Sequence, residues 1–148
     1  MAALPASRLA SGFQDGIKIW NVHSGELLSA IAGHSDAVNA IVRLSDTEFA
    51  SGSWDQTIMI WDADTGDLKM TLIGHSDEVT SLVKLPNGDL ASGSMDGFLR
   101  VWNCKTGELK SEANKKSSSL YKLCMLPNGQ IVSGWEDRTV KIHGFTSE

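Results

Sequence analysis

The sequence predicts an all-β protein built from about three and a half copies of one repeat, each copy forming a four-stranded antiparallel sheet. The first observation is a tryptophan every 41 residues, at Trp20, Trp61 and Trp102, with His143 at the next step. The second is that short apolar segments alternate with turn residues throughout the chain, which favours strands over helices. The repeats divide the chain at roughly residues 1–32, 33–73, 74–114 and 115–148.

Other positions recur at intervals of 40 or 41 residues and justify the division. A Ser-Gly pair followed by an aspartate occurs in every repeat, at Ser11-Gly12 with Asp15, Ser51-Gly52 with Asp55, Ser92-Gly93 with Asp96, and Ser133-Gly134 with Asp137. Glycines, leucines and histidines keep the spacing of 41 residues as well, at Gly25, Gly66 and Gly107, at Leu44, Leu85 and Leu126, and at His34 and His75. Chance does not produce so many registered positions.

The second repeat shows how one copy divides into strands. We expect strands at 37–44, 48–53, 57–61 and 67–72, and the last strand leads into the next repeat. The turns carry glycine, as in Pro86-Asn87-Gly88, Pro127-Asn128-Gly129 and Thr65-Gly66, because glycine adopts positive φ without steric strain.

The third strand indicates how the sheets are arranged. Residues 57–61, Thr-Ile-Met-Ile-Trp, carry apolar side chains on both faces of the strand, whereas a sheet with one face in water would alternate apolar and polar residues. A sheet covered on both faces by neighbouring sheets needs this pattern. Sheets stacked radially with a period of about 40 residues form a β-propeller, here a partial one.

These motifs resemble those of the WD-repeat family, over essentially the whole chain. The resemblance rests on Gly33-His34, Gly74-His75 and Trp61-Asp62, with Trp20-Asn21 and Trp102-Asn103 as variants. It implies that a histidine, a serine, an aspartate and a tryptophan are hydrogen-bonded within each sheet. The implied networks are His34, Ser51, Asp55 and Trp61 in one sheet, and His75, Ser92, Asp96 and Trp102 in the next.

The two end repeats depart from the pattern. In the fourth, Lys115-Lys116 replace Gly-His and His143 replaces tryptophan, so we expect an incomplete network and looser packing. In the first, residues 4–11 align without a gap on residues 44–51, so we expect the N-terminus to be the tail of a repeat and not a targeting segment. We expect either a fragment of a longer propeller or a half-ring that pairs with a second copy.

Composition excludes several classes of function. The net charge of −5 disfavours general nucleic-acid binding, and no apolar run is long enough to span a membrane. Cys104 and Cys124 lack metal-type spacing, so we expect no metal, no cofactor and an intracellular protein, cytoplasmic or nuclear. A serine, histidine and aspartate could suggest a catalytic triad. Because the same set recurs in consecutive repeats, a structural role explains it better, and we expect no enzyme activity.

The resemblance also implies a partner-binding face, formed by three positions in each repeat. The residues at these positions are Gln14, Ala37, Asn39, Trp54, Glu78, Thr80, Met95, Ser119, Tyr121 and Glu136. We expect Trp54, Met95 and Tyr121 to form an apolar patch bordered by Asn39, Thr80, Glu78 and Glu136. Alternatively, Trp54 or Tyr121 packs against a neighbouring loop. Phe13 and Trp135, at the position of Ser53 and Ser94, are expected to pack between sheets.

The sequence therefore predicts a non-catalytic protein–protein interaction scaffold or substrate-recognition module. Glu78 and Glu136 would suit a basic peptide. A reader of ubiquitin or of a modified peptide, within a ubiquitin-pathway or signalling assembly, is a narrower alternative that the sequence cannot separate from the first. An enzymatic or small-ligand propeller would need clustered carboxylates, histidines or a metal set, and no such cluster is evident.

Overall fold

The computed structural model describes residues 1–113 and 118–144, and within them every regular element is a β-strand. The strands form successive antiparallel sheets, in chain order within each sheet. The first sheet contains β1 (Ala2–Leu4), β2 (Arg8–Phe13), β3 (Gly16–Asn21) and β4 (Leu27–Ile31). The second contains β5 (Val38–Arg43), β6 (Glu48–Ser53), β7 (Ile58–Asp62) and β8 (Leu68–Leu72).

The later repeats follow the same plan. The third sheet contains β9 (Val79–Lys84), β10 (Leu90–Ser94), β11 (Leu99–Trp102) and β12 (Leu109–Ala113). The fourth has three strands within the described residues, β13 (Leu120–Met125), β14 (Ile131–Trp135) and β15 (Val140–His143). The prediction of an all-β partial propeller with four-stranded repeats is confirmed, and the expected strands of the second repeat agree with β5 to β8 to within a residue.

The hairpin turns follow from their glycines. Gly88 and Gly129 have φ of 89° and 82°, in the turns that join β9 to β10 and β13 to β14. Such angles strain any residue that carries a Cβ, so the Asn-Gly pairs fix where these strands reverse.

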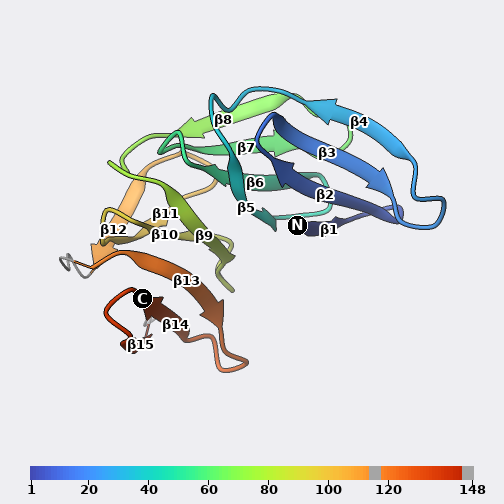
Figure 1. Ribbon diagram of the computed structural model, residues 1–148. Coiled ribbons are helices and arrows are strands. Elements are labelled where there is room, and N and C mark those ends of the chain that lie inside the picture. The colour runs from blue at the N-terminus through green and yellow to red at the C-terminus, as the bar shows by residue number, and fades with distance from the viewer. Residues whose placement is uncertain (114–117, 145–148) are drawn as a thin grey trace.

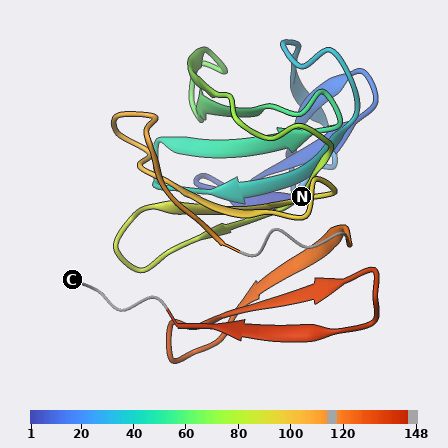
Figure 2. The same cartoon turned by 90° about the vertical axis from the view of Figure 1, so that its left-hand side faces the viewer.

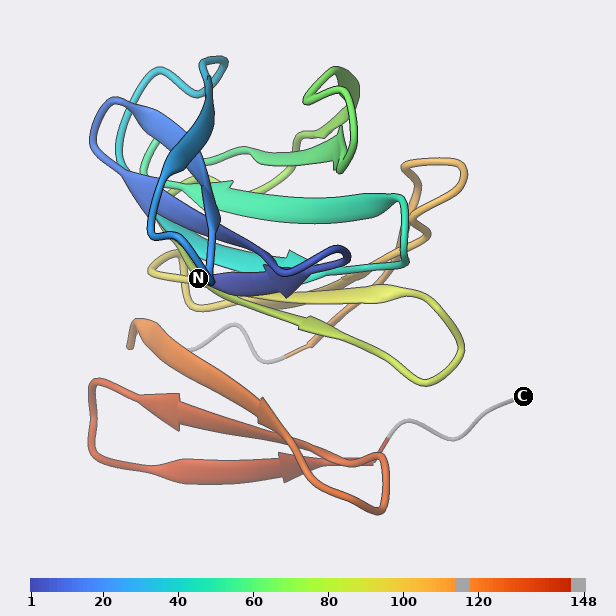
Figure 3. The same ribbon diagram turned by 90° about the vertical axis from the view of Figure 1, so that its right-hand side faces the viewer.

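The sheets lie side by side, with their first strands innermost. β1 lies against β5, β5 against β9, and β9 against β13 (Figure 1). Figures 2 and 3 show the fourth sheet as the end layer, beside the third. We call the end of the sheets where the first strands begin and the second strands finish the loop end.

The hydrophobic core consists of separate clusters, one between each pair of neighbouring sheets. The first cluster includes Ile17 and Trp61, the second Ile58 and Trp102, and the third Leu99 with side chains of the fourth sheet. Trp61 and Trp102 thus pack toward the preceding sheet, while the third-strand aliphatic side chains pack toward the following one. This explains why the third strand is apolar on both faces.

Trp135 is buried in the third cluster, but Phe13 is different. The Phe13 ring lies 6.5 Å from the Trp20 ring and 4.5 Å from the Lys18 ammonium, both in its own sheet, and 39% of the residue is exposed. The expectation that Phe13 packs between sheets therefore does not match these contacts. The described part of the chain contains no helix that could span a bilayer.

Candidate functional site

A buried polar network ties together the strands of the second sheet. His34 Nε2 lies 2.7 Å from Ser51 Oγ, and His34 Nδ1 lies 2.8 Å from Asp55 Oδ2. The indole N–H of Trp61 donates to Ser51 Oγ at 2.7 Å. Ser51 is fully buried, so its hydroxyl satisfies two groups that would otherwise lack partners.

The third sheet repeats this geometry. His75 lies 2.7 Å from Ser92 Oγ and 2.8 Å from Asp96 Oδ2, and Trp102 donates to Ser92 Oγ at 2.8 Å. Two neighbouring sheets with the same arrangement point to a framework that holds the loop end, rather than to a catalytic centre.

The aspartates of both networks are held ionised. Burial alone would raise the pKa of Asp55, but hydrogen bonds from Thr57, from His34 and from the Ser35 amide outweigh it and lower the pKa. The pKa of Asp96 is lowered further, because the hydrogen bond and attraction of the His75 ring add to backbone hydrogen bonds that oppose the burial. Each carboxylate therefore links the loop that precedes the first strand of its sheet to the turn that follows the second strand.

Arg100 extends the network in the third sheet, and sequence reasoning missed it. Its Nη1 lies 2.6 Å from Asp96 Oδ2 and 2.6 Å from His75 Nδ1, and its Nη2 lies 3.3 Å from Glu112. Arg100 is buried, and its Nε has no hydrogen-bond partner in the described structure. The sequence did contain one indication of this role, because Arg100 stands at the position where the second repeat has the apolar Met59.

The end sheets satisfy their serines differently. In the first sheet, Trp20 donates to Ser11 Oγ at 2.7 Å. In the fourth, Ser133 Oγ accepts the indole N–H of Trp135 at 2.8 Å and lies 2.7 Å from His143 Nε2. Lys115 and Lys116, which take the place of Gly-His in the sequence, lie outside the described residues.

The predicted partner-binding positions gather at the loop end. In three sheets a backbone hydrogen bond of 3.0 Å joins the turn after the second strand to the segment before the first strand. The bonded pairs are Trp54 with Ala37, Met95 with Glu78, and Glu136 with Ser119. The sequence therefore placed these residues at one end of the sheets, while the adjacency of Trp54, Met95 and Tyr121 stays a prediction.

Three of the positions occupy β-bulges. Asn39, Thr80 and Tyr121 are the extra residues where the first strand shifts register against the second. A bulge redirects a side chain away from the regular alternation of the strand. Asn39 and Tyr121 are exposed, as are Gln14, Trp54 and Glu136, whereas Met95 and Glu78 are half-buried.

Thr80 has a different role from the one expected of it. Its hydroxyl lies 2.5 Å from the Leu120 carbonyl oxygen and 3.1 Å from that of Gly93, so it bridges the third and fourth sheets. Glu136 is also engaged, because its carboxylate accepts the Ser119 hydroxyl at 3.1 Å. Thr80 therefore supports the loop end and offers little free hydrogen-bonding capacity to a partner.

Carboxylates cluster where the second and third sheets meet at the loop end. The pKa of Glu78 is raised, first by burial and then by the negative charges of Asp77 and Asp36. Asp36 and Asp77 each accept the amide of the next residue, at 2.7 and 2.8 Å. The local potential is negative, and a cation placed there would relieve the repulsion.

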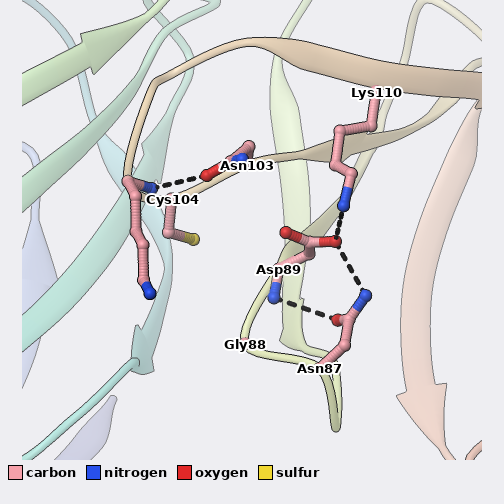
Figure 4. Close-up of a pocket in the computed structure, with 7 residues that line it drawn as sticks. Asn87, Gly88, Asp89, Asn103, Cys104 and Lys110 are labelled. Carbon is pink, nitrogen blue, oxygen red and sulfur yellow. Dashed lines mark hydrogen bonds and ion pairs between the residues drawn. The ribbon is translucent and has the colours of Figure 1, made fainter.

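A pocket of about 370 Å³ lies at the opposite end of the third sheet (Figure 4). There Asp89 accepts from Lys110 at 2.6 Å and from Asn87 at 2.8 Å. Burial, together with the nearby carboxylates, raises the pKa of the Cys104 thiol to about 11, so the thiol stays protonated at neutral pH. The pocket therefore holds no activated nucleophile, and the described residues contain no group of His, Cys, Asp or Glu suited to a metal ion.

Radially arranged sheets with this repeated His–Ser–Asp–Trp network define a WD-type β-propeller. The family model for the WD domain, G-beta repeat, matches residues 25–62 and 66–103, which together are about half of the chain. The chain belongs to the WD40-repeat family.

Comparison with solved structures agrees. The chain is 30% identical to the WD40 β-propeller domain of Doa1, with a TM-score of 0.85 over 92% of this chain and 46% of that one. It is also 40% identical, over 53 residues, to the periodic tryptophan protein 2 homolog of Schizosaccharomyces pombe, a match that covers 34% of this chain and 6% of the relative. The chain therefore spans less than half the length of either protein. WD40 propellers generally mediate protein–protein interactions and are generally non-catalytic scaffolds.

Proposed function

We propose that this chain is a non-catalytic protein-binding module that recognises its partner through the loop end, as a scaffold or a substrate receptor. The observation that carries the proposal is the exposure of Trp54 and Tyr121, 43% and 47%, at the end where the networks hold the backbone in place. Large aromatic side chains on a rigid support are typical of binding hot spots, because little entropy is lost when a partner covers them.

The charges favour a basic partner segment. Glu78, Asp77 and Asp36 concentrate negative charge next to the loop that carries Trp54. The Trp54 amide donates to the carbonyl oxygen of Ala37, the residue after Asp36. A lysine or arginine could pair with Glu78, and the face of an indole also attracts cations. We infer that the partner presents at least one cationic side chain beside an apolar one.

The test begins with capture of partners from a cell extract, followed by titration of the purified partner. Trp54→Ala is expected to weaken binding by about 30-fold, equivalent to about 2 kcal/mol, without lowering the unfolding midpoint. Glu78→Gln should weaken binding less and reduce its dependence on salt. Val22→Ala is the matched control, because Val22 is an exposed apolar side chain in the turn after β3, at the opposite end.

Two results would contradict the proposal. A large loss of stability in Trp54→Ala would mean that this tryptophan packs within the chain. Unchanged affinity in both Trp54→Ala and Tyr121→Ala would remove the loop end as the site. A partner identified as ubiquitin or as a modified peptide would narrow the proposal to a reader.

A further inference from the structure

Two hairpin turns of the chain share the sequence Leu-Pro-Asn-Gly, at residues 85–88 and 126–129. Each turn joins the first strand of its sheet to the second, β9 to β10 and β13 to β14. Both asparagines are exposed, and Asn87 is exposed although the fourth sheet lies beside its own. The two turns therefore place the same chemical group in water at equivalent positions.

An asparagine followed by glycine can lose its side-chain amide without an enzyme. Hydroxide removes the proton from the glycine amide, and the amide nitrogen then attacks Cγ of the asparagine. The new C–N bond closes an imide ring, and the bond from Cγ to Nδ2 breaks as ammonia leaves. Glycine favours this attack because it has no Cβ in the way and moves more freely than other residues.

Water then opens the ring at one of its two carbonyl carbons. Opening at one carbonyl gives aspartate with a normal backbone, and opening at the other gives isoaspartate, in which the main chain runs through the former side chain. Isoaspartate lengthens the turn by a methylene group. In the fourth sheet, this would disturb the register that sets Met125 opposite Ile131.

In the folded protein the amide groups of both glycines are engaged. Gly88 donates to the Leu85 carbonyl oxygen at 3.0 Å, and Gly129 donates to that of Leu126 at 2.9 Å. Ring closure therefore requires the turn to open, and its rate follows the fraction of time that the turn spends open. How fast each asparagine reacts thus depends on how firmly its turn is held.

The turn of the third sheet is held by a charged group. Asn87 Nδ2 donates to Asp89 Oδ2 at 2.8 Å, and the same oxygen accepts from Lys110 of β12 at 2.6 Å (Figure 4). The Asp89 side chain is only 10% exposed. A hydrogen bond to an ionised acceptor is roughly twice as strong as one between neutral groups, so this carboxylate holds the turn closed.

The turn of the fourth sheet has a neutral group at the same place. Asn128 Nδ2 donates to Gln130 Oε1 at 2.7 Å, and the Gln130 side chain makes no other hydrogen bond to the described residues. Gln130 is half-buried, whereas Asp89 is buried. The turn that contains Asn128 should therefore open more often than the turn that contains Asn87.

We propose that Asn128 is a site of spontaneous deamidation, where the chain acquires aspartate and isoaspartate, and that the Asp89–Lys110 pair protects Asn87 from the same reaction. The isoaspartyl form becomes a substrate for repair methyltransferases, which transfer the methyl group of S-adenosylmethionine to the isoaspartyl carboxylate and release S-adenosylhomocysteine. This site lies at the end of the sheets opposite the loop end, and its reaction does not depend on partner binding.

The test follows deamidation of the full chain in mildly alkaline buffer, by peptide mapping with mass spectrometry and by enzymatic methylation of isoaspartate. Asn128 is expected to react about fivefold faster than Asn87, because a charged hydrogen bond holds a turn closed more firmly than a neutral one. In denaturant, where neither turn is formed, the two rates should converge.

Exchanging the residues that follow the glycines provides matched variants. Asp89→Gln gives the third sheet the turn sequence of the fourth, Pro-Asn-Gly-Gln, and should accelerate the reaction at Asn87 by about fivefold. Gln130→Asp makes the reverse change and should slow the reaction at Asn128. In each variant the other asparagine is the internal control, because a general loss of stability would accelerate both sites together.

Three outcomes would overturn the proposal. The first is an Asn128 that reacts no faster than Asn87 in the folded chain. The second is a difference between the two sites that persists in denaturant, which would assign it to the neighbouring sequence and not to the turns. The third is an Asp89→Gln protein in which both sites accelerate equally, because global unfolding would then explain the reaction.

Discussion

Alanine substitutions at Gly12 and Gly134 should have opposite effects on stability, although the two glycines occupy the same repeat position. A Cβ on Gly12 would overlap the Val38 carbonyl oxygen and would lie 2.7 and 2.9 Å from Val38 Cγ1 and Cβ. Because backbone and a β-branched side chain cannot move aside, the first and second sheets must separate. Overpacking in a well-packed interface costs about 1–3 kcal/mol, and a backbone overlap places Gly12→Ala near the upper limit.

Gly134→Ala meets no described atom within 4 Å, so no packing penalty applies. Replacing a strand glycine by alanine reduces the entropy of the unfolded chain, which should stabilise the protein by about 0.4–1 kcal/mol. The assay is urea denaturation of the two variants and the parent, followed by circular dichroism and by tryptophan fluorescence. A Gly134→Ala protein as unstable as Gly12→Ala would refute the reasoning, as would an unperturbed Gly12→Ala protein.

Two further predictions concern the buried networks. Ser51→Ala removes the acceptor of the Trp61 indole and the partner of His34, so unfolding experiments should show a loss of about 2–6 kcal/mol, at about 1–3 kcal/mol for each of the two orphaned groups. The pKa of Asp96 is lowered in the folded state, so the ionised carboxylate stabilises the folded protein. Its contribution to the free energy of unfolding is complete above the unfolded pKa of about 4 and is lost as the pH falls below that value. Asp96→Asn should therefore lower stability at neutral pH and flatten its decline in acid, and a decline as steep as the parent's would contradict this assignment.

The repeat made most of the fold predictable. A period of 41 residues fixes the register of every sheet at once, because equivalent residues must occupy equivalent places. The family resemblance implied the contacts of His34 and His75, and the repeat implied that both sheets share them. The strand limits in the second repeat also agree with the structure.

Contacts between sheets were less predictable. The hydroxyl of Thr80 reaches the Leu120 carbonyl only because a bulge turns it toward the fourth sheet, and bulges leave no clear mark in the sequence. Arg100 is buried and pairs with Asp96 and Glu112, whereas an arginine in a strand would ordinarily be assigned to the surface. The repulsion between Glu78 and Asp36 depends on how close two sheets lie, which periodicity alone does not give.

The residue two positions after the network serine differs between the repeats. In the second sheet this residue is Ser53, which donates to the Asp36 carbonyl at 3.0 Å and so holds the loop that brings in His34. The third sheet uses Ser94 and the Asp77 carbonyl in the same way.

In the fourth repeat, where Lys115-Lys116 replace Gly-His, the corresponding residue is Trp135, and in the first repeat it is Phe13. Trp135 turns its indole N–H to Ser133 and is buried, so it supplies both the hydrogen bond and the volume that the standard set of residues would provide. The Phe13 ring lies beside the Trp20 ring but leaves it partly exposed. Within the described structure, no other sheet packs against the Trp20 indole. The fourth sheet therefore keeps a buried serine satisfied by a different route. Restoring a histidine alone would not rebuild the standard network there, because the Ser133 hydroxyl already has two partners, the Trp135 indole and His143 Nε2.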